Sequence, residues 1–367
     1  GFRMDVINFI SKVEGLPDAP PVPGQEYVNA FALFADGPRI HEFLQEMHRE
    51  VFAGREGSLL AVGEMPGVTV EEARLFTDPA RREVDMVFQF EHVGLDHGTS
   101  KWDVHPLRMR DLKASFGRWQ AGLADVGWNS LYWDNHDQPR AVSRFGDDSP
   151  QHRVASAKLL ATVLHLHRGT PYVYQGEELG MTNMPFADAG AFLDIESVNY
   201  HSTAVGGGAD PVAVLEALRE GSRDNARSPV QWDASPHAGF TTGEPWFPVN
   251  PNHDEVNAEH ALADPDSVFH HYRRLIELRH TDPVVSDGRF ALLLPEHPTL
   301  WAFTRTLGEE ALLVVANLSG DPLALPDLGE PGWAGAALVL GTHPDTPATH
   351  ADDAVLRPWE ARVLRRP

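Results

Sequence analysis

Apolar positions in the first 175 residues alternate between short uninterrupted runs and runs spaced by three or four residues. The uninterrupted runs predict strands that are covered on both faces, at 1–7, 59–63, 84–90, 130–134 and 171–174. The spaced runs predict helices at 39–52, 112–123 and 159–164. Thr69 with Glu72 predicts one more helix that begins with a capping box. Alternating strands and helices predict an α/β fold with a parallel sheet, either a (β/α) barrel or an open doubly wound sheet.

The pattern changes twice after this part. Residues 176–264 are rich in Gly, Pro and Asn without a clear period, which predicts an elaborated loop with short helices, one at 212–219. A helix is predicted at 267–279. Then short strand-like runs alternate with turn residues, at 289–294, 300–304, 311–317, 336–340 and 361–364. We therefore expect an α/β domain over 1–283 and a C-terminal β-sandwich domain over 284–367.

Charge and composition exclude several classes of function. The chain has 53 Asp+Glu against 30 Lys+Arg, a formal net charge of −23, so we expect neither nucleic acid nor an anionic membrane surface as a partner. The absence of Cys excludes thiol catalysis, disulfides and Cys-ligated zinc. No uninterrupted apolar run reaches the length of a membrane span, and no glycine-rich phosphate loop follows a predicted strand.

Three predicted strands lead directly to an acidic residue: Asp5, Glu64 and Asp137. A single acidic residue after a strand more often belongs to a turn or caps a helix. Three of them, each at the end of a predicted strand, indicate a site at the mouth of a barrel. Arg3, two residues before Asp5, falls on the same side of its strand and there stabilises a carboxylate. His136 directly precedes Asp137.

Glycoside hydrolysis is a chemistry that needs several carboxylates around one bond, one as nucleophile or base and one as a protonated acid. Aromatic side chains that could stack on sugars are present, although each is more often part of a core. They are Phe90, Trp102, Trp133, Trp232, Trp246 and Phe247.

Five segments closely resemble motifs of the alpha-amylase family of glycoside hydrolases, and most of all its oligo-1,6-glucosidase and alpha-glucosidase group. They are residues 1–8, 62–67, 132–140, 172–178 and 222–229. The resemblance covers essentially the whole chain. It implies that Asp5 is the nucleophile, Glu64 the general acid/base and Asp137 the transition-state stabiliser. It also places three residues around the sugar of the first subsite: Arg3, His136 and Arg223.

The resemblance begins at the fourth strand of the family's eight-stranded barrel. It implies the second half of a (β/α)8 TIM barrel over 1–283, followed by the antiparallel all-β domain over 284–367. We therefore expect the N-terminal part of the barrel to be a missing partner and the isolated chain to be inactive. The family's Asn-His motif and the segment that can hold a metal would lie in that part, so we expect no metal site here and no cofactor. We expect a cytoplasmic location.

The resemblance implies a retaining α-glucosidase that acts on α-1,6 bonds of short, isomaltose-like oligosaccharides. Val6 favours this, because the 1,6-specific members carry Val after the nucleophile and the 1,4-specific ones usually Thr or Ala. An α-1,4-glucosidase, a trehalose-6-phosphate hydrolase and a sucrose isomerase stay open as alternatives. Residues 93–98 read VGLDHG, where the isomerases carry RLDRD, which disfavours isomerisation. A non-catalytic sugar-binding relative is disfavoured because the three carboxylates are kept.

Overall fold

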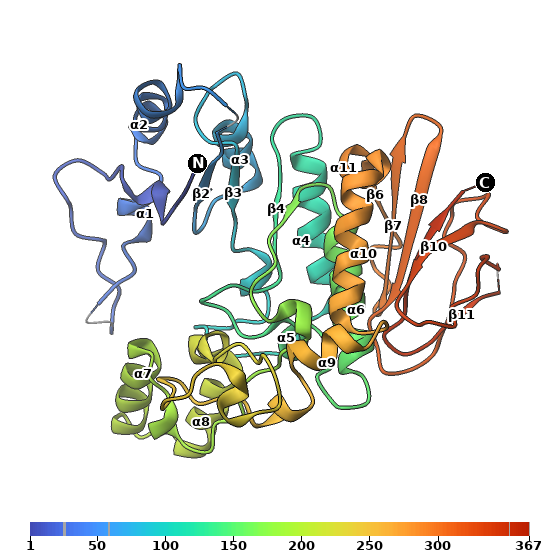
Figure 1. The fold of residues 1–367 in the computed structure, drawn as a ribbon. Coiled ribbons are helices and arrows are strands. Elements are labelled where there is room, and N and C mark those ends of the chain that lie inside the picture. The colour runs from blue at the N-terminus through green and yellow to red at the C-terminus, as the bar shows by residue number, and fades with distance from the viewer. Residues whose placement is uncertain (25–26, 58, 352, 367) are drawn as a thin grey trace. The chain divides into compact units, whose positions relative to one another are not determined.

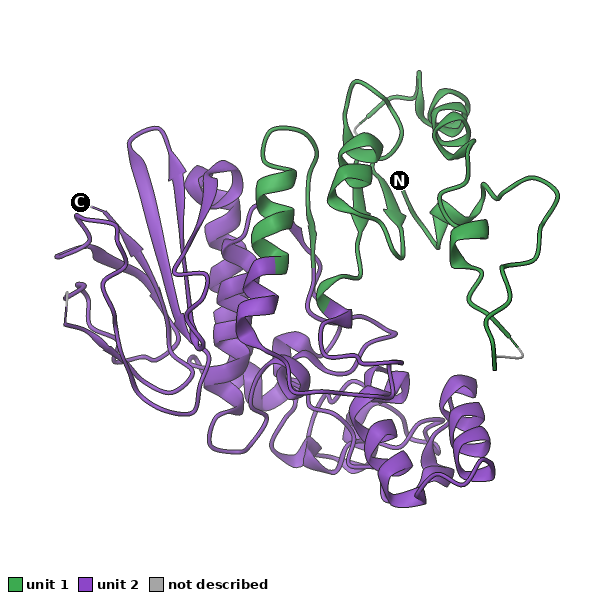
Figure 2. Ribbon diagram, turned by 180° about the vertical axis from the view of Figure 1, so that it is seen from behind, with its two compact units in different colours: residues 1–92, 115–131 green, residues 93–114, 132–367 purple. Residues whose placement is uncertain are grey.

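The structure is a computed structural model that describes residues 1–24, 27–57, 59–351 and 353–366. The chain divides into two compact units, which Figure 2 distinguishes by colour: unit 1 is 1–92 with 115–131, and unit 2 is 93–114 with 132–367. Figure 1 labels the elements. The domain boundary expected between residues 283 and 284 falls inside unit 2 and stays a prediction.

Unit 1 contains a parallel sheet in the order β1-β2-β3. Its strands are β1 (Phe2–Met4), β2 (Ala61–Glu64) and β3 (Met86–Phe88). Val87 also forms a parallel bridge to Asn129, directly before β4 (Ser130–Leu131). The predicted parallel sheet is confirmed with strands shorter than expected, and the carboxyl ends of its strands lie along one edge.

The helices of unit 1 follow the sequence pattern closely. The helix expected at 39–52 is α2 (Ile40–Met47), continued by a π-helical turn (His48–Phe52). The capping box of Thr69 and Glu72 is present and opens α3 (Val70–Thr77). The helix expected at 112–123 is α4 (Met109–Gly122), whose residues are divided between the units. Two single turns were not expected, a 3₁₀ turn (Ile7–Phe9) and α1 (Phe31–Phe34).

Unit 2 contains helices that the sequence pattern predicted and others that it did not, because they lack a strong apolar period. The expected ones are α6 (Arg153–Leu166), α8 (Pro211–Gly221) and α10 (Val268–Thr281). The others are α5 (Ala141–Phe145), α7 (Ile195–Gly206), α9 (Ala258–Ala263) and α11 (Pro283–Asp287). A short strand, β5 (Thr170–Pro171), and 3₁₀ turns, among them Glu177–Leu179 and Arg223–Arg227, complete this part. The long loop of the sequence is therefore largely ordered as short helices and turns.

The C-terminal part of unit 2 is an antiparallel sheet in the order β10-β12-β8-β7-β6. Its strands are β6 (Arg289–Leu293), β7 (Leu300–Leu307), β8 (Glu310–Asn317), β10 (Ala337–Gly341) and β12 (Ala361–Arg365). Strand β8 is buried almost throughout, because α6 and α11 contact it while Leu313 and Val315 join an apolar cluster with Trp333. All five predicted strands are confirmed, and a small pair, β9 (Leu323–Ala324) with β11 (Val355–Leu356), adds to them.

Candidate active site

Asp5 and Glu64 lie at the carboxyl ends of two neighbouring parallel strands of unit 1. Asp5 follows the last residue of β1, and Glu64 is the last residue of β2. Because the register pairs Met4 with Gly63, the two acidic residues occupy corresponding positions on adjacent strands. In barrels of parallel strands, catalytic side chains lie at this edge.

Arg3 connects the two carboxyl groups. Its Nη1 lies 2.5 Å from Oδ1 of Asp5, and its Nη2 lies 2.6 Å from Oε1 of Glu64. The surroundings of the two acids differ, because the Asp5 side chain is 75% exposed and that of Glu64 only 10%. The pairing of Arg3 with Asp5 agrees with the two-residue spacing in the sequence, whereas its bond to Glu64 depends on the strand register.

The surroundings of Glu64 favour the protonated form of its carboxyl group. Its pKa is raised above the ordinary value, chiefly because burial penalises the ionised form, and the nearby charge of Asp5 acts in the same direction. Arg3 and the backbone N–H of Val6, which donates to Oε2 at 3.1 Å, act against this. Glu64 therefore keeps its proton to higher pH than an exposed glutamate does.

The backbone at Val6 has a conformation that its side chain disfavours. Val6 has φ 36° and ψ 44°, in the left-handed region, where a non-glycine residue costs about 1–2 kcal/mol. In this conformation its N–H reaches the Glu64 carboxyl. The strain is thus located between the predicted nucleophile and the predicted acid.

Asp137 lies in the loop between β4 and α5, within unit 2, among basic side chains. The nearest guanidinium is that of Arg227, whose Nη2 lies 2.9 Å from Oδ1 of Asp137. Nε2 of His136 lies 3.6 Å from Oδ2, and Nε of Arg223 lies 3.8 Å from Oδ1. Asn135 shapes the loop, because its Oδ1 accepts the backbone N–H of Asp137 at 2.8 Å. The structure thus brings together His136, Asp137 and Arg223 in unit 2.

Arg227 is the residue that the sequence analysis missed. Besides Asp137, its guanidinium contacts Oδ2 of Asp194 at 2.5 Å, and its Nε donates to the backbone carbonyl of His136 at 3.3 Å. The signal was present in the segment 222–229, which contains two arginines. The resemblance singled out only Arg223, although the 3₁₀ helix Arg223–Arg227 carries both.

Arg223 is paired with Glu196 and not with Asp224, its neighbour in the sequence. Its Nε lies 3.0 Å from Oε2 of Glu196, which also contacts Nζ of Lys101 at 2.7 Å. The adjacent Asp224 is buried and accepts the backbone N–H of Leu193 at 2.6 Å. Arg223 and Asp224 therefore have separate partners, although they are sequence neighbours of opposite charge.

The candidate sugar-stacking aromatics separate into three groups: two are buried, two are exposed, and Phe90 and Trp102 are half-buried. Trp133 and Phe247 are buried, and the indole N–H of Trp133 donates to the carbonyl of Leu160 at 2.8 Å, so both belong to the core. Trp102 stacks on Tyr200, with ring centroids 4.5 Å apart. Two others are exposed: Trp232 and Trp246.

Comparison with known proteins identifies the family. The alpha-amylase catalytic domain matches residues 1–288. Oligo-1,6-glucosidases from Halalkalibacterium halodurans and Parageobacillus thermoglucosidasius are each 50% identical, covering 99% and 100% of this chain but 64% and 65% of their own length. The crystal structure of isomaltulose synthase from Klebsiella has a TM-score of 0.92 at 38% identity, covering 99% of this chain and 64% of that one. Trehalose-6-phosphate hydrolase from Bacillus licheniformis has a TM-score of 0.90 at 41% identity, with the same two coverages.

The chain therefore belongs to the alpha-amylase family of glycoside hydrolases. Its fold class is the second half of a (β/α)8 barrel followed by an antiparallel β domain, as the resemblance implied. It spans about 64% of the length of the relatives it matches. Within the described ranges, no helix has the length and apolar composition that a membrane span requires. The same residues contain no group of three or more His, Asp or Glu side chains arranged to hold a metal.

Proposed function

We propose that the protein is a retaining α-glucosidase that hydrolyses α-1,6 bonds at the non-reducing end of short gluco-oligosaccharides. The observation that supports this most is the pair of carboxyls at the ends of β1 and β2, both held by Arg3, of which one is exposed and the other buried. Relatives at 50% identity that carry the name oligo-1,6-glucosidase support the same substrate class. A cytoplasmic location stays a prediction.

In the proposed reaction, the carboxylate of Asp5 attacks the anomeric carbon. Glu64 donates its proton to the glycosidic oxygen, which leaves with the second sugar as an alcohol. A covalent glycosyl ester on Asp5 results. Glu64, now ionised, takes a proton from a water molecule whose oxygen displaces Asp5 and releases glucose with retained configuration. The raised pKa of Glu64 suits the first step, because the acid must be protonated near neutral pH.

Asp137 has the proposed role of stabilising the positive charge that develops on the sugar ring. Its contacts with Arg227 and His136 support this, because they fix the direction of the carboxylate. Arg223 and His136 are proposed to bind the glucose of the first subsite, together with Arg3. Val6 is proposed to shape the site that receives the leaving sugar.

One contact in the structure argues against an alternative activity, the isomerisation of sucrose. In the loop where sucrose isomerases carry RLDRD, Asp96 forms a buried ion pair with Arg144, and both side chains are only 7% exposed. Arg144 also donates to the side chain of Gln138 at 2.6 Å. The carboxylate of Asp96 is thus occupied within the protein, which supports hydrolysis.

The proposal is tested by giving the full-length protein four substrates: isomaltose, maltose, sucrose and trehalose 6-phosphate. We expect isomaltose to have the highest kcat/KM, and Asp5→Asn to lower it about 10³-fold or more. Asp18→Asn, an exposed residue of the same unit, is the matched control and should leave it unchanged. A higher kcat/KM for any of the other three substrates would contradict the proposed specificity, and an active Asp5→Asn variant would contradict the nucleophile.

A further inference from the structure

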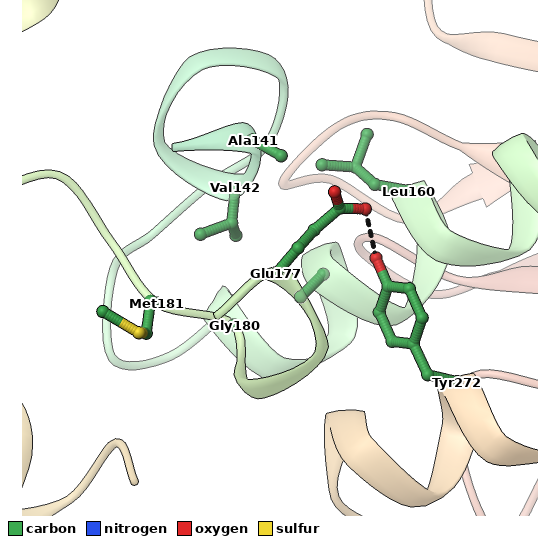
Figure 3. A pocket seen from close by; sticks show the side chains of 8 residues that line it. Ala141, Val142, Leu160, Glu177, Gly180, Met181 and Tyr272 are labelled. Carbon is green, nitrogen blue, oxygen red and sulfur yellow. Dashed lines mark hydrogen bonds between the residues drawn. The ribbon is translucent and has the colours of Figure 1, made fainter. Parts of the chain in front are cut away.

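Two carboxyl groups are buried side by side in unit 2, next to the loop that carries Asp137. Asp134 lies near the start of this loop, and Glu177 begins the 3₁₀ turn Glu177–Leu179. Both side chains are buried, and Figure 3 shows the Glu177 carboxyl between Ala141 and Tyr272. The surroundings are mainly apolar, since the cavity there is lined by residues such as Val142, Leu160 and Met181. Water therefore does little to stabilise two negative charges here.

Each carboxyl has one oxygen with a conventional donor. Oδ2 of Asp134 accepts the backbone N–H of Ala141 at 2.9 Å, and Oε1 of Glu177 accepts the hydroxyl of Tyr272 at 2.5 Å, the dashed line in Figure 3. The other two oxygens, Oδ1 of Asp134 and Oε2 of Glu177, are buried and have no donor at hydrogen-bonding distance and angle among the described residues. The backbone of Tyr174 also acts on the Glu177 carboxyl and favours its ionised form. The two side chains are within hydrogen-bonding reach of each other. A bond between these two oxygens requires a proton on one of them.

The charges nearby can balance one carboxylate but not two. The buried guanidinium of Arg140 lies close to Asp134, although its hydrogen bonds go to the hydroxyl of Ser228 and to backbone carbonyls, those of Gln175, Asn225 and Ala226. Other titratable groups that face the pair, or its partner Tyr272, are Tyr174, Glu178 and His165. None of these adds a second positive charge, because burial lowers the pKa of His165 to about 4. Burial and the charge of Asp134 both raise the pKa of Glu177 well above its ordinary range.

We propose that Glu177 is protonated and donates its proton to Asp134, and that this buried bond positions the loop that presents Asp137. Asp134 holds the two ends of the loop together through its bond to the N–H of Ala141. Ionisation of both carboxyls would push Asp134 away from Glu177 and loosen that closure. Glu177 is thus a positioning residue, and its effect on catalysis rests on the proposed function.

The proton is tested by thermal unfolding of the chain and its Glu177→Gln variant between pH 5 and 8. A glutamine amide can replace the protonated carboxyl, because it donates to Asp134 and accepts from Tyr272. A raised pKa in the folded state means that the stability of the wild type falls as the pH rises above the unfolded pKa, by up to about tenfold in the folding equilibrium per pH unit. The Glu177→Gln variant does not lose stability in this way, because the amide does not ionise. Its Tm should equal that of the wild type near pH 5 and exceed it increasingly towards pH 8.

Glu178→Gln is the matched control, because Glu178 is the neighbouring acid and accepts the backbone N–H of Gly176 at 2.8 Å. Its Tm difference from the wild type should not grow in the same direction with pH. If the Tm of Glu177→Gln relative to the wild type stays constant or falls as the pH rises, the proposal is overturned, because Glu177 would then be ionised in the folded state.

The positioning role is tested on the activity of the full-length protein. Glu177→Ala should lower kcat at least about tenfold with KM changed less than about threefold, and Glu177→Gln should restore most of that loss. Equal losses in the two variants would overturn the positioning role. A wild type that hydrolyses no glucoside would refute the proposed function and the positioning of a catalytic residue with it, while the unfolding experiment still decides whether the buried bond exists. If Glu177→Ala does not fold, the pH dependence for Glu177→Gln decides.

Discussion

Arg227 is the strongest test of the arrangement around Asp137, because it was found from the structure alone. The change is Arg227→Met, which keeps most of the length of the side chain and removes its charge. It deletes the contact with Asp137 at 2.9 Å and the contact with Asp194 at 2.5 Å. The first bears on catalysis and the second on stability.

The expected size of the catalytic effect follows from the single bond to Asp137. A hydrogen bond to a charged group contributes about 1.5–3 kcal/mol, and each 1.4 kcal/mol on a barrier is a factor of about ten. Because Asp137 is proposed to act on the transition state, kcat should fall roughly 10- to 150-fold while KM changes little. The Asp194 side chain is only 5% exposed and would lose its guanidinium, so Tm should fall as well.

The assay is steady-state hydrolysis of isomaltose by the full-length protein, with the fold of each variant checked by circular dichroism. Arg219→Met is the matched control: Arg219 is similarly exposed, pairs with Glu216 at 2.6 Å, and donates to a backbone carbonyl rather than to Asp137. It should keep the wild-type kcat. A folded Arg227→Met variant whose kcat stays within about threefold of the wild type would refute the reasoning, as would a change confined to KM.

Three further predictions concern the first unit. Proton NMR of the first-formed product should show α-glucose, as expected of enzymes whose carboxyls stand about 5–5.5 Å apart; β-glucose would eliminate Asp5 as nucleophile. Wild-type activity should fall as the pH rises through the raised pKa of Glu64, and Glu64→Gln should lack this limb. Azide should restore the turnover of an activated aryl glucoside by Glu64→Gln as an α-glycosyl azide, whereas the azide product of Asp5→Ala should be the inverted β-azide; a β-azide from Glu64→Gln would reverse the assignment. Val6→Thr should shift the kcat/KM ratio from isomaltose towards maltose by no more than about 1–3 kcal/mol, and an unchanged ratio would mean that Val6 only packs.

The fold could be predicted well where burial dictates the residue type. Strand β8 lies between helices and an apolar cluster, so its sequence is an apolar run that is easily read. Thr69 marks the start of α3 because a capping box is local in sequence. Helix α7 was missed because Ile195 and Val198 are exposed and Ser197 is its only buried residue, which leaves no apolar period. Its N-cap, Asp194, which accepts the N–H of Glu196, was the available signal.

The contacts of the candidate site could be predicted only where both residues lie in the same motif. Arg3 and Asp5 are two residues apart on one strand, so their pairing follows from the sequence. The bond between Arg3 and Glu64 needs the register of β1 against β2 and joins residues 61 positions apart. The contact of Arg227 with Asp137 joins residues 90 positions apart, in a segment without regular period. Such contacts depend on how the chain folds back, which composition and spacing do not encode.

The single guanidinium between the two acids has a consequence for the timing of the proposed reaction. In the free enzyme, the negative charge of Asp5 helps to hold the proton on Glu64, while Arg3 favours its release. Once Asp5 becomes a neutral ester, its repulsion disappears and the positive charge of Arg3 acts on Glu64 alone. The affinity of Glu64 for its proton should then fall, at the stage when a base is needed instead of an acid. The glycosylation state of one side chain would thereby reset the protonation state of the other in each catalytic cycle, without any movement of the backbone.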